Sequence, residues 1–505
     1  MSSSTAQQRA MTEFELKFEV SPKNLKSVAV AMLQGKVIRQ RLQASYFDTA
    51  DGALAAHGIV VRLRKEGRRG VQTAKGPTAD LLERLEHNFP LPIKPAGAVP
   101  VLDLSRHCST PVGQAIDKAL ARKAGDNYPD LGLLYGTDVQ RITRLVPCGG
   151  SVVEVALDQG RVFANGRSQP ICELEVELKE GSPHEAVTLA RQWSATHGLW
   201  MSTIAKSMKG QSLRGDAALT VATSAVWPKF SRHTGGPAMV CAVVAACLAQ
   251  ILPNMSQLAG GSGQPDHIHQ LRVGIRRLRT ALHELAGLTD AIDPAWEAAL
   301  VQTFRALGTH RDHSHLALVL QPQLLAAGGP DIQFGAGSDN APDPGDTVRH
   351  PEFQDALLGL VGFVHGNMSK TAEKPDGLKK VIARRLEKLH KRALHDGRKF
   401  LALEEAEQHS VRKRLKRLRY LMEFAAPLFG SGKVNRMAAA LKPVQDALGL
   451  YNDELMALYA WRDLAANQPK AWYGIGWLTA RKQPNAKRCL KKIKTFALIK
   501  PFWRG

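Results

Sequence analysis

The chain has 505 residues, of which 44% are hydrophobic and 23% charged, a balance typical of globular domains that excludes disorder along most of its length. Lysine and arginine total 68 against 46 aspartate and glutamate residues, so the formal net charge is +22. At roughly 150 residues per domain, this length predicts more than one domain. The six cysteines form no Cys-x-x-Cys pair, which argues against a zinc ribbon or a disulfide framework and favours a reducing compartment.

The first 20 residues have neither a basic n-region nor an apolar h-region, so we expect no secretory signal. The longest apolar run, near residues 238–249, is shorter than the about 20 residues that cross a bilayer. We therefore expect a cytoplasmic protein without a transmembrane segment.

Residues 11 to about 215 alternate apolar and charged side chains over short runs, which is the periodicity of β-strands. Residues 13–19 read EFELKFE and residues 172–179 read CELEVELK, whereas residues 61–64 (VRLR) and 72–75 (QTAK) carry cations. Alternation alone predicts an antiparallel sheet with one solvated face. The strands also sort by sign, and glutamates two residues apart repel one another. A closed barrel that holds a divalent metal on carboxylates and phosphates on cations explains both features.

The ordered motifs of this half resemble the CYTH family of triphosphate tunnel metalloenzymes. They are ExExK at Glu13, YFDT at Tyr46, VRLR at Val61, TAK at Thr73, ERLE at Glu83, Arg141, ALDQG at Ala156, CELEVELKEG at Cys172 and IAKS at Ile204. The resemblance implies an eight-stranded antiparallel β tunnel over residues 11–215 that binds a linear triphosphate with Mg²⁺ or Mn²⁺.

By the same resemblance, each set of site residues has an expected role. The metal ligands are Glu13, Glu15, Asp158, Glu173 and Glu175, and the catalytic set is Glu13, Glu15, Lys17, Glu173 and Glu175. The triphosphate clamp is Lys17, Arg62, Arg64, Lys75, Arg84, Arg141 and Lys206. Lys206 is equally consistent with a surface lysine, and Glu19, Glu177 and Lys179 are expected at solvated strand ends.

The spacing of apolar residues changes between the two halves of the chain. Residues 216–236 read as a linker, and residues 237–505 have the Ala/Leu/Arg-rich spacing of helices. Residues 328–347, rich in Gly, Pro and Asp, predict a flexible loop between two helical repeats at about 237–327 and 348–505. Residues 1–220 contain 28 basic and 22 acidic residues, a net of +6, which leaves 40 and 24, a net of +16, for the remainder. This excess predicts a polyanionic partner for the C-terminal half.

One basic pattern occurs twice in this half, starting at His269 and at His409. In each copy the histidine is followed by Arg three residues later, by Arg or Lys seven residues later and by Arg ten residues later. At ~100° per residue, offsets of 0, 3, 7 and 10 residues fall on one stripe of a helix, and apolar residues occupy the opposite side. A charged stripe is usually a solvated face, but such faces normally mix acids with bases. The duplication predicts an all-α helical-bundle domain built from two similar parts.

This half resembles the CHAD domain, a family associated with inorganic polyphosphate. The resemblance implies polyphosphate contacts at His269, Arg272, Arg276, Arg279, His409, Arg412, Lys416 and Arg419. We therefore expect a metal-dependent inorganic triphosphatase, cleaving tripolyphosphate to pyrophosphate and phosphate, that also binds long-chain polyphosphate and associates with polyphosphate granules.

Two alternatives stay open. One is a non-catalytic polyphosphate-granule binding protein, and the other is a CYTH enzyme acting on an organic triphosphate, of thiamine triphosphatase or adenylate cyclase type. Nucleic acid is disfavoured as a partner because the stripes lack interleaved aromatic residues for base stacking. The sequence gives no oligomeric state.

Overall fold

The computed structural model describes residues 12–67, 69–91, 101–123, 125–215, 221–332, 342–366 and 375–504. The chain divides into two compact units. The barrel unit comprises Met1–Ala222, Met255–Ser262 and Arg349–Gly366, and the helical unit comprises Thr223–Asn254, Gly263–Val348 and Asn367–Gly505. Two segments from the expected helical range 237–505 therefore belong to the barrel unit.

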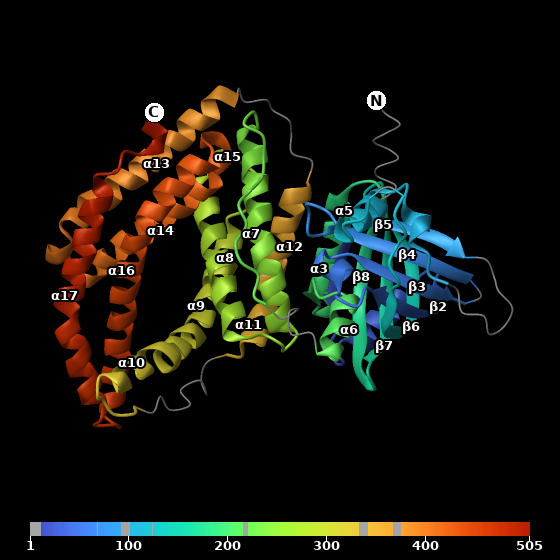
Figure 1. The fold of residues 1–505 in the computed structure, drawn as a ribbon, viewed down its shortest axis with the longest axis horizontal. Coiled ribbons are helices and arrows are strands. Elements are labelled where there is room, and N and C mark those ends of the chain that lie inside the picture. Colours follow the sequence, from blue (N-terminus) through green and yellow to red (C-terminus); the bar gives the residue numbers. More distant parts are fainter. Residues whose placement is uncertain are drawn as a thin grey trace. The chain divides into compact units, whose positions relative to one another are not determined.

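The barrel unit is built on one antiparallel sheet (Figure 1). Its strands are β1 (Thr12–Glu19), β2 (Ile38–Asp48), β3 (Val60–Glu66), β4 (Arg69–Pro77), β5 (Glu83–Leu91), β6 (Gly132–Cys148), β7 (Ser151–Ala164), β8 (Arg167–Glu180) and β9 (Trp200–Met201). The order is β5-β4-β3-β2-β6-β7-β8-β1-β9, and β5 also pairs with β1. This pairing closes eight strands into a barrel, which confirms the predicted antiparallel tunnel.

The alternation along each strand decides which side chains enter the barrel. Phe14, Leu16 and Phe18 on β1 are buried, and helix α5 (Pro183–His197) packs against β1 and β8. Because successive side chains point to opposite faces of a strand, Glu13, Glu15 and Lys17 face the interior. The apolar side chains of β1 thus lie outside the barrel wall and its charged side chains within it, whereas Leu42 of β2 and Val139 of β6 are core residues that line the cavity.

Shorter helices complete the barrel unit. They are α2 (Leu25–Met32), α3 (Ala53–Ala56), the 3₁₀ turn η1 (Leu104–His107), α4 (Pro111–Ala119), α6 (Lys206–Arg214) and α12 (Pro351–His365). Helix α12 packs against α5, where the guanidinium of Arg191 donates to Asp355 at 2.8 and 2.9 Å. Ser182 caps the start of α5 through the His184 amide, and Gly198 ends it at a positive φ of 60°.

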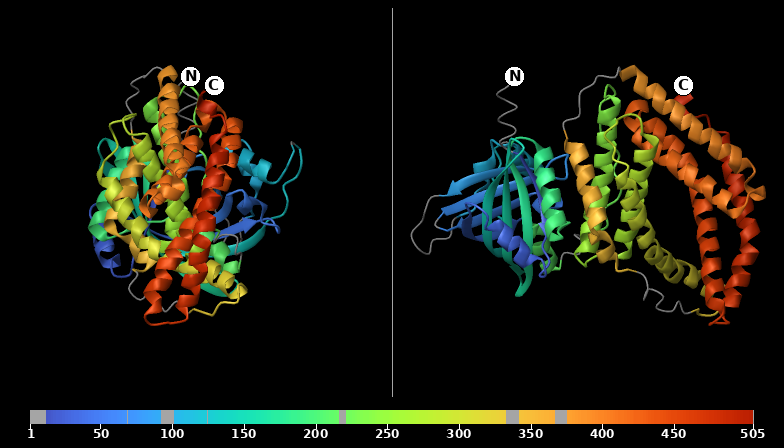
Figure 2. Two further views of the ribbon diagram at one scale, coloured as in Figure 1. Left: turned by 90° about the vertical axis from the view of Figure 1, so that its left-hand side faces the viewer. Right: turned by 180° about the vertical axis from the view of Figure 1, so that it is seen from behind.

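The helical unit contains only helices among its described residues (Figure 2). They are α7 (Gly236–Ala259, whose last turn belongs to the barrel unit), α8 (Pro265–Glu284), α9 (Ala295–His315), the π-helix η3 (Leu316–Leu320), α10 (Gln321–Ala326), α11 (Pro344–Arg349), α13 (Pro375–Arg398), η4 (Phe400–Ala402), α14 (Glu405–Phe424), α15 (Ala426–Phe429), α16 (Ser431–Ala465), α17 (Ala471–Ala497) and η5 (Phe502–Arg504). The prediction of a helical C-terminal domain is confirmed.

The two copies of the basic pattern lie on α8 and α14, which are both 20 residues long and pack against each other. Arg277 of α8 lies 3.9 Å from Glu423 of α14, and Arg417 of α14 lies 4.0 Å from Glu284 of α8. Arg277 and Arg417 occupy the same position in the two copies. The reciprocal ion pairs therefore match the internal duplication seen in the sequence.

Part of the expected loop 328–347 is helical, since α11 begins at Pro344. The Asp343 carboxylate accepts the Asp346 amide at 3.0 Å and so starts this helix. Residues 333–341 of the expected loop and residues 216–220 of the expected linker lie outside the described residues.

Helix α7 is longer than the apolar run suggested. It has 24 residues and a window of mean hydropathy 1.9, so by length and composition it passes the test for a membrane-spanning helix. Two thirds of that window is buried, and its buried polar side chains, among them Gln250 and Asn254, form hydrogen bonds to neighbouring segments. These features are typical of a core helix, so the helix is weak evidence for a membrane span.

Candidate functional site

A cavity of about 330 Å³ lies inside the barrel. Every residue that we expected to bind metal or triphosphate in this half lines it, including Lys206, so the surface alternative for that lysine is wrong. These residues are Glu13, Glu15, Lys17, Arg62, Arg64, Lys75, Arg84, Arg141, Asp158, Glu173, Glu175 and Lys206. The strands and helix α6 thus bring together side chains that are up to 193 positions apart in the sequence, counting from Glu13 to Lys206.

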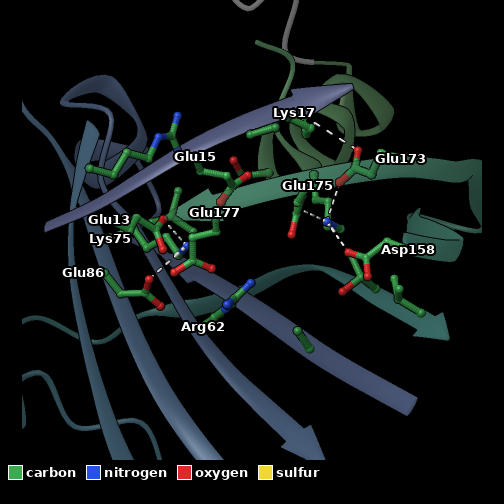
Figure 3. Close-up of a pocket in the computed structure, with 18 of the residues that line it drawn as sticks. Glu13, Glu15, Lys17, Arg62, Lys75, Glu86, Asp158, Glu173, Glu175 and Glu177 are labelled. Atoms are coloured by element: carbon green, nitrogen blue, oxygen red, sulfur yellow. Dashed lines mark hydrogen bonds and ion pairs between the residues drawn. The ribbon is translucent and has the colours of Figure 1, made fainter. Parts of the chain in front are cut away.

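Three carboxylates meet on one wall of this cavity (Figure 3). Asp158 on β7 lies directly opposite Glu173 on β8, and Glu175 follows two residues later on the same face. One oxygen from each lies within 4.8 Å of the others, and Asp158 and Glu173 are fully buried. We call these three residues the acidic cluster.

Cations neutralise the acidic cluster. The Lys206 ammonium lies 2.6 Å from Asp158 and 2.7 Å from Glu175, and it also pairs with Glu173. The Arg141 guanidinium donates to both oxygens of Asp158 at 2.6 Å and contacts Glu175. Burial alone would lower the pKa of Lys206, but the three carboxylates raise it well above its ordinary value. Lys206 is therefore held as a cation.

Glu13 and Glu15 lie on β1, on the N-terminal side of Lys17, outside the acidic cluster. Glu13 pairs with Lys75, whose ammonium is also 3.3 Å from Glu86. Burial raises the pKa of Glu13 to about 9, and burial with the nearby Glu175 carboxylate raises the pKa of Glu15 to about 7. Since Lys17 is the residue opposite Glu175, Glu13 is offset from that pair by about 13 Å along the strand. Within the described part of the chain, the acidic cluster is the group close enough to share one ion, and neither Glu13 nor Glu15 belongs to it.

The cations of β3 to β5 line another part of the cavity. Arg62 donates to the Tyr46 hydroxyl at 3.4 Å, and Arg64 pairs with Glu66. Burial, with Arg62 nearby, lowers the pKa of Arg64 to about 10. No hydrogen bond or ion pair joins the side chain of Arg84 to another described residue, and this side chain lines the cavity. A cavity that holds these cations together with a cluster of three carboxylates suits a metal-bound polyphosphate chain.

Several cavity residues were not predicted. Glu177 and Lys179 line the cavity and form an ion pair at 2.7 Å. Lys179, next to the end of β8 at Glu180, is exposed as expected of a solvated strand end, whereas Glu177 is partly buried. Lys209 is absent from the described lining of the cavity but is buried beside it, 2.8 Å from Glu19 and 3.5 Å from Glu173. It follows Lys206 by three residues on α6, and this helical spacing was a usable signal. Other lining residues that were not assigned a role include Tyr46, Glu86 and Glu154.

The acidic cluster fits a divalent cation by its donor chemistry. Its ligands are carboxylate oxygens, which Mg²⁺ and Mn²⁺ prefer. The three carboxylates are already balanced by positive charge in the form of the Lys206 ammonium. A divalent ion would take over this neutralisation, with Asp158, Glu173 and Glu175 as its ligands.

The basic stripes of the helical unit are partly engaged with the protein. Arg272 donates to the Phe304 carbonyl at 2.6 Å, and Arg279 pairs with Glu297 at 2.8 Å. His409 bonds Asn452 at 2.8 Å, and the apolar sides of both helices are buried. The remaining stripe residues are Arg276, Lys416 and Arg412, which are partly buried, and His269 and Arg419, which are exposed. Arg419 pairs with Glu423 at 2.8 Å.

Comparisons with known proteins agree with both resemblances. Residues 11–209 match the CYTH domain and residues 242–462 match the CHAD domain. An inorganic triphosphatase from Haemophilus influenzae is 26% identical over 216 residues, which is 42% of this chain and 57% of that relative, so the chain matches only about half of the relative's length.

Solved structures with similar folds include the CHAD domain of the plant Ricinus communis, at 22% identity and a TM-score of 0.45, covering 56% of this chain and 98% of that one. A proposed adenylyl cyclase from Hippeastrum with a dominant triphosphatase activity has 15% identity and a TM-score of 0.29, covering 41% of this chain and 95% of that one.

Proposed function

The chain joins a CYTH domain at residues 11–209 to a CHAD domain at residues 242–462, and from this premise we propose that it hydrolyses inorganic tripolyphosphate to pyrophosphate and phosphate in the barrel. The observation that carries the proposal is that one cavity holds both the acidic cluster and the cations Arg62, Arg64 and Arg84. Phosphoryl transfer needs charge neutralisation and in-line positioning more than covalent chemistry from the protein.

Each group has a role in this proposal. Arg62, Arg64 and Arg84 bind the phosphate oxygens and orient the chain along the cavity. Asp158, Glu173 and Glu175 would hold Mg²⁺ or Mn²⁺, which would supply charge neutralisation at the phosphoryl group under attack. Lys206 balances the acidic cluster and donates to phosphate oxygen once its carboxylates are engaged. The closed barrel limits access of bulk water, which strengthens each of these interactions.

We further propose that the helical domain binds long-chain polyphosphate through its basic stripes. The support is the excess positive charge of this half and the duplication of the stripe on α8 and α14. An anion chain across both helices would relieve repulsion among like charges on each. A polyphosphate chain bound there would hold the protein at its substrate source.

A substrate panel tests the enzymatic proposal. Phosphate release is measured from tripolyphosphate, ATP, thiamine triphosphate and long-chain polyphosphate, each with and without Mg²⁺ or Mn²⁺. We expect metal-dependent release from tripolyphosphate that is lost in Asp158→Ala and kept in Arg276→Ala. Tight binding without turnover would identify a granule-binding protein instead, and faster turnover of ATP or thiamine triphosphate would identify an organic triphosphate as the substrate.

A further inference from the structure

The segment Met201–Ala205 carries Lys206 into the cavity. It leaves β9 at Met201 and ends at Ala205, the residue before the first turn of α6, in which Lys206 is the first residue. Met201, Ser202, Thr203 and Ala205 all line the cavity themselves. The position of the Lys206 ammonium therefore depends on how this short segment is fixed.

Three successive backbone amides of the segment are tied to other parts of the barrel unit. The Ser202 amide donates to the Lys17 carbonyl of β1 at 2.8 Å. The Met201 amide donates to the side-chain oxygen of Gln354 at 2.8 Å, and the Thr203 amide donates to the Ser256 hydroxyl at 2.9 Å. Gln354 lies on α12 and Ser256 in the last turn of α7, so both lie within the range that matches the CHAD domain.

Both acceptors are themselves held firmly. Gln354 is 1% exposed, and its amide nitrogen donates to the Met255 sulfur at 3.6 Å. Ser256 is 2% exposed and also contacts the Thr203 hydroxyl at 3.2 Å. A buried amide that loses its acceptor cannot turn to water, so the segment would have to shift to satisfy it.

We propose that Gln354 and Ser256 are positioning residues for Lys206, so that triphosphate binding and turnover in the barrel require two side chains supplied from beyond the barrel's own sequence. The inference rests on the proposed function for its readout, since Lys206 acts on the triphosphate. It assigns to α12 and the end of α7 a role in the reaction as well as in packing.

The test compares Gln354→Met in the full chain with Asp355→Asn as a matched control. Methionine keeps the length of the side chain but removes the amide acceptor, and Asp355 lies on the same helix with its carboxylate paired to Arg191 of α5. Three quantities are measured: hydrogen exchange of the Met201 and Thr203 amides, calorimetric affinity for tripolyphosphate, and kcat and KM for its hydrolysis.

For Gln354→Met we expect exchange of these amides to accelerate and affinity or kcat/KM to fall by about 10-fold, as for loss of one buried hydrogen bond that positions a reacting group. Asp355→Asn should leave all three unchanged. Ser256→Ala should act in the same direction, and the double variant should fall short of the sum because both bonds hold one segment.

Wild-type exchange, affinity and kcat/KM in Gln354→Met would overturn the inference, as would a lower melting temperature with unchanged affinity and kcat/KM, because that result describes packing alone. If the wild-type protein binds tripolyphosphate without hydrolysing it, the proposed hydrolase function fails, and the affinity comparison still decides whether Gln354 positions Lys206. If the wild-type protein does not bind tripolyphosphate, both proposals are wrong.

Discussion

The Lys206 ammonium lies 2.6 Å from the Asp158 carboxylate, at the meeting point of three acidic side chains. Three carboxylates so close together repel strongly unless a cation lies among them. In this structure the lysine supplies that cation, and a divalent ion bound by the same oxygens would compete for its place. Lysine and metal ion are therefore expected to exchange when the barrel binds its substrate.

This exchange predicts how Lys206→Met responds to metal. Without divalent ions the variant should have a lower melting temperature than the wild type, because it loses the one described cation that contacts all three carboxylates. Arg141 contacts only Asp158 and Glu175 of the cluster, and Lys17 and Lys209 contact only Glu173. Adding Mg²⁺ or Mn²⁺ should raise the melting temperature more in the variant than in the wild type, since binding to the folded state alone stabilises it. Equal shifts in a calorimetric scan of both proteins would contradict a metal site at this cluster.

Removal of one carboxylate from the acidic cluster should impair the reaction. Glu173→Gln keeps the shape of the side chain but removes a buried negative charge, so we expect kcat/KM for tripolyphosphate to fall by about 100-fold. The Mg²⁺ concentration needed for half-maximal activity should rise. Asp138→Asn is the control, because Asp138 pairs with Arg41 at 2.6 Å and does not line the cavity. Phosphate-release kinetics over a range of metal concentrations measure both effects, and similar losses in the two variants would rule out the assigned role.

The barrel could be predicted because the charged residues of its strands recur with the two-residue period of a β-strand. Charged side chains at every second position, in motifs of fixed order, indicated both the closed sheet and the face that looks inward. Which of these side chains lie next to one another within the cavity was harder to predict, because this depends on strand register. Asp158 lies opposite Glu173, whereas Glu13 lies opposite Arg84. Register arises from pairing between distant strands, and no local pattern encodes it.

Other features had no signal in the sequence. Gln354 follows Met201 by 153 residues and sits in a helix that reads as part of the second domain. The length of α7 was also missed, because Gln250 and Asn254 interrupt its apolar run. Both side chains are buried and hydrogen-bonded in the folded protein, so the helix continues past them.

The basic stripes should affect long chains without affecting the barrel. Arg276→Ala combined with Lys416→Ala is expected to weaken long-chain polyphosphate binding by about 10-fold or more, because each removes a charge-assisted contact. Tripolyphosphate hydrolysis should stay unchanged. Lys65→Ala with Lys487→Ala removes the same charge from exposed positions elsewhere and serves as the control. If both pairs weaken binding equally in a titration at fixed salt, net charge rather than the stripes explains it.

The buried His107, which contacts His87, predicts how stability depends on pH. His107 is fully buried, and its ring bonds Gln72 at 2.9 Å and His87 at 2.8 Å. Burial, with His87 beside it, lowers the pKa of His107 from 6.5 to about 4. Between these values the unfolded chain binds a proton that the folded protein excludes, so the free energy of unfolding should decrease as the pH falls from 6.5 to 4.

The size of this effect follows from the shift, which corresponds to about 3 kcal/mol when the pH has passed below both pKa values. His107→Gln removes the titrating group, so its unfolding free energy should start lower at pH 7 and fall less steeply between pH 6.5 and 4. Urea unfolding of the full chain at a series of pH values measures both slopes when the signal reports unfolding of the barrel unit, which contains His107. Equal slopes in the two proteins would show that His107 does not contribute to acid sensitivity, and a steeper slope in the variant would reverse the assigned sign.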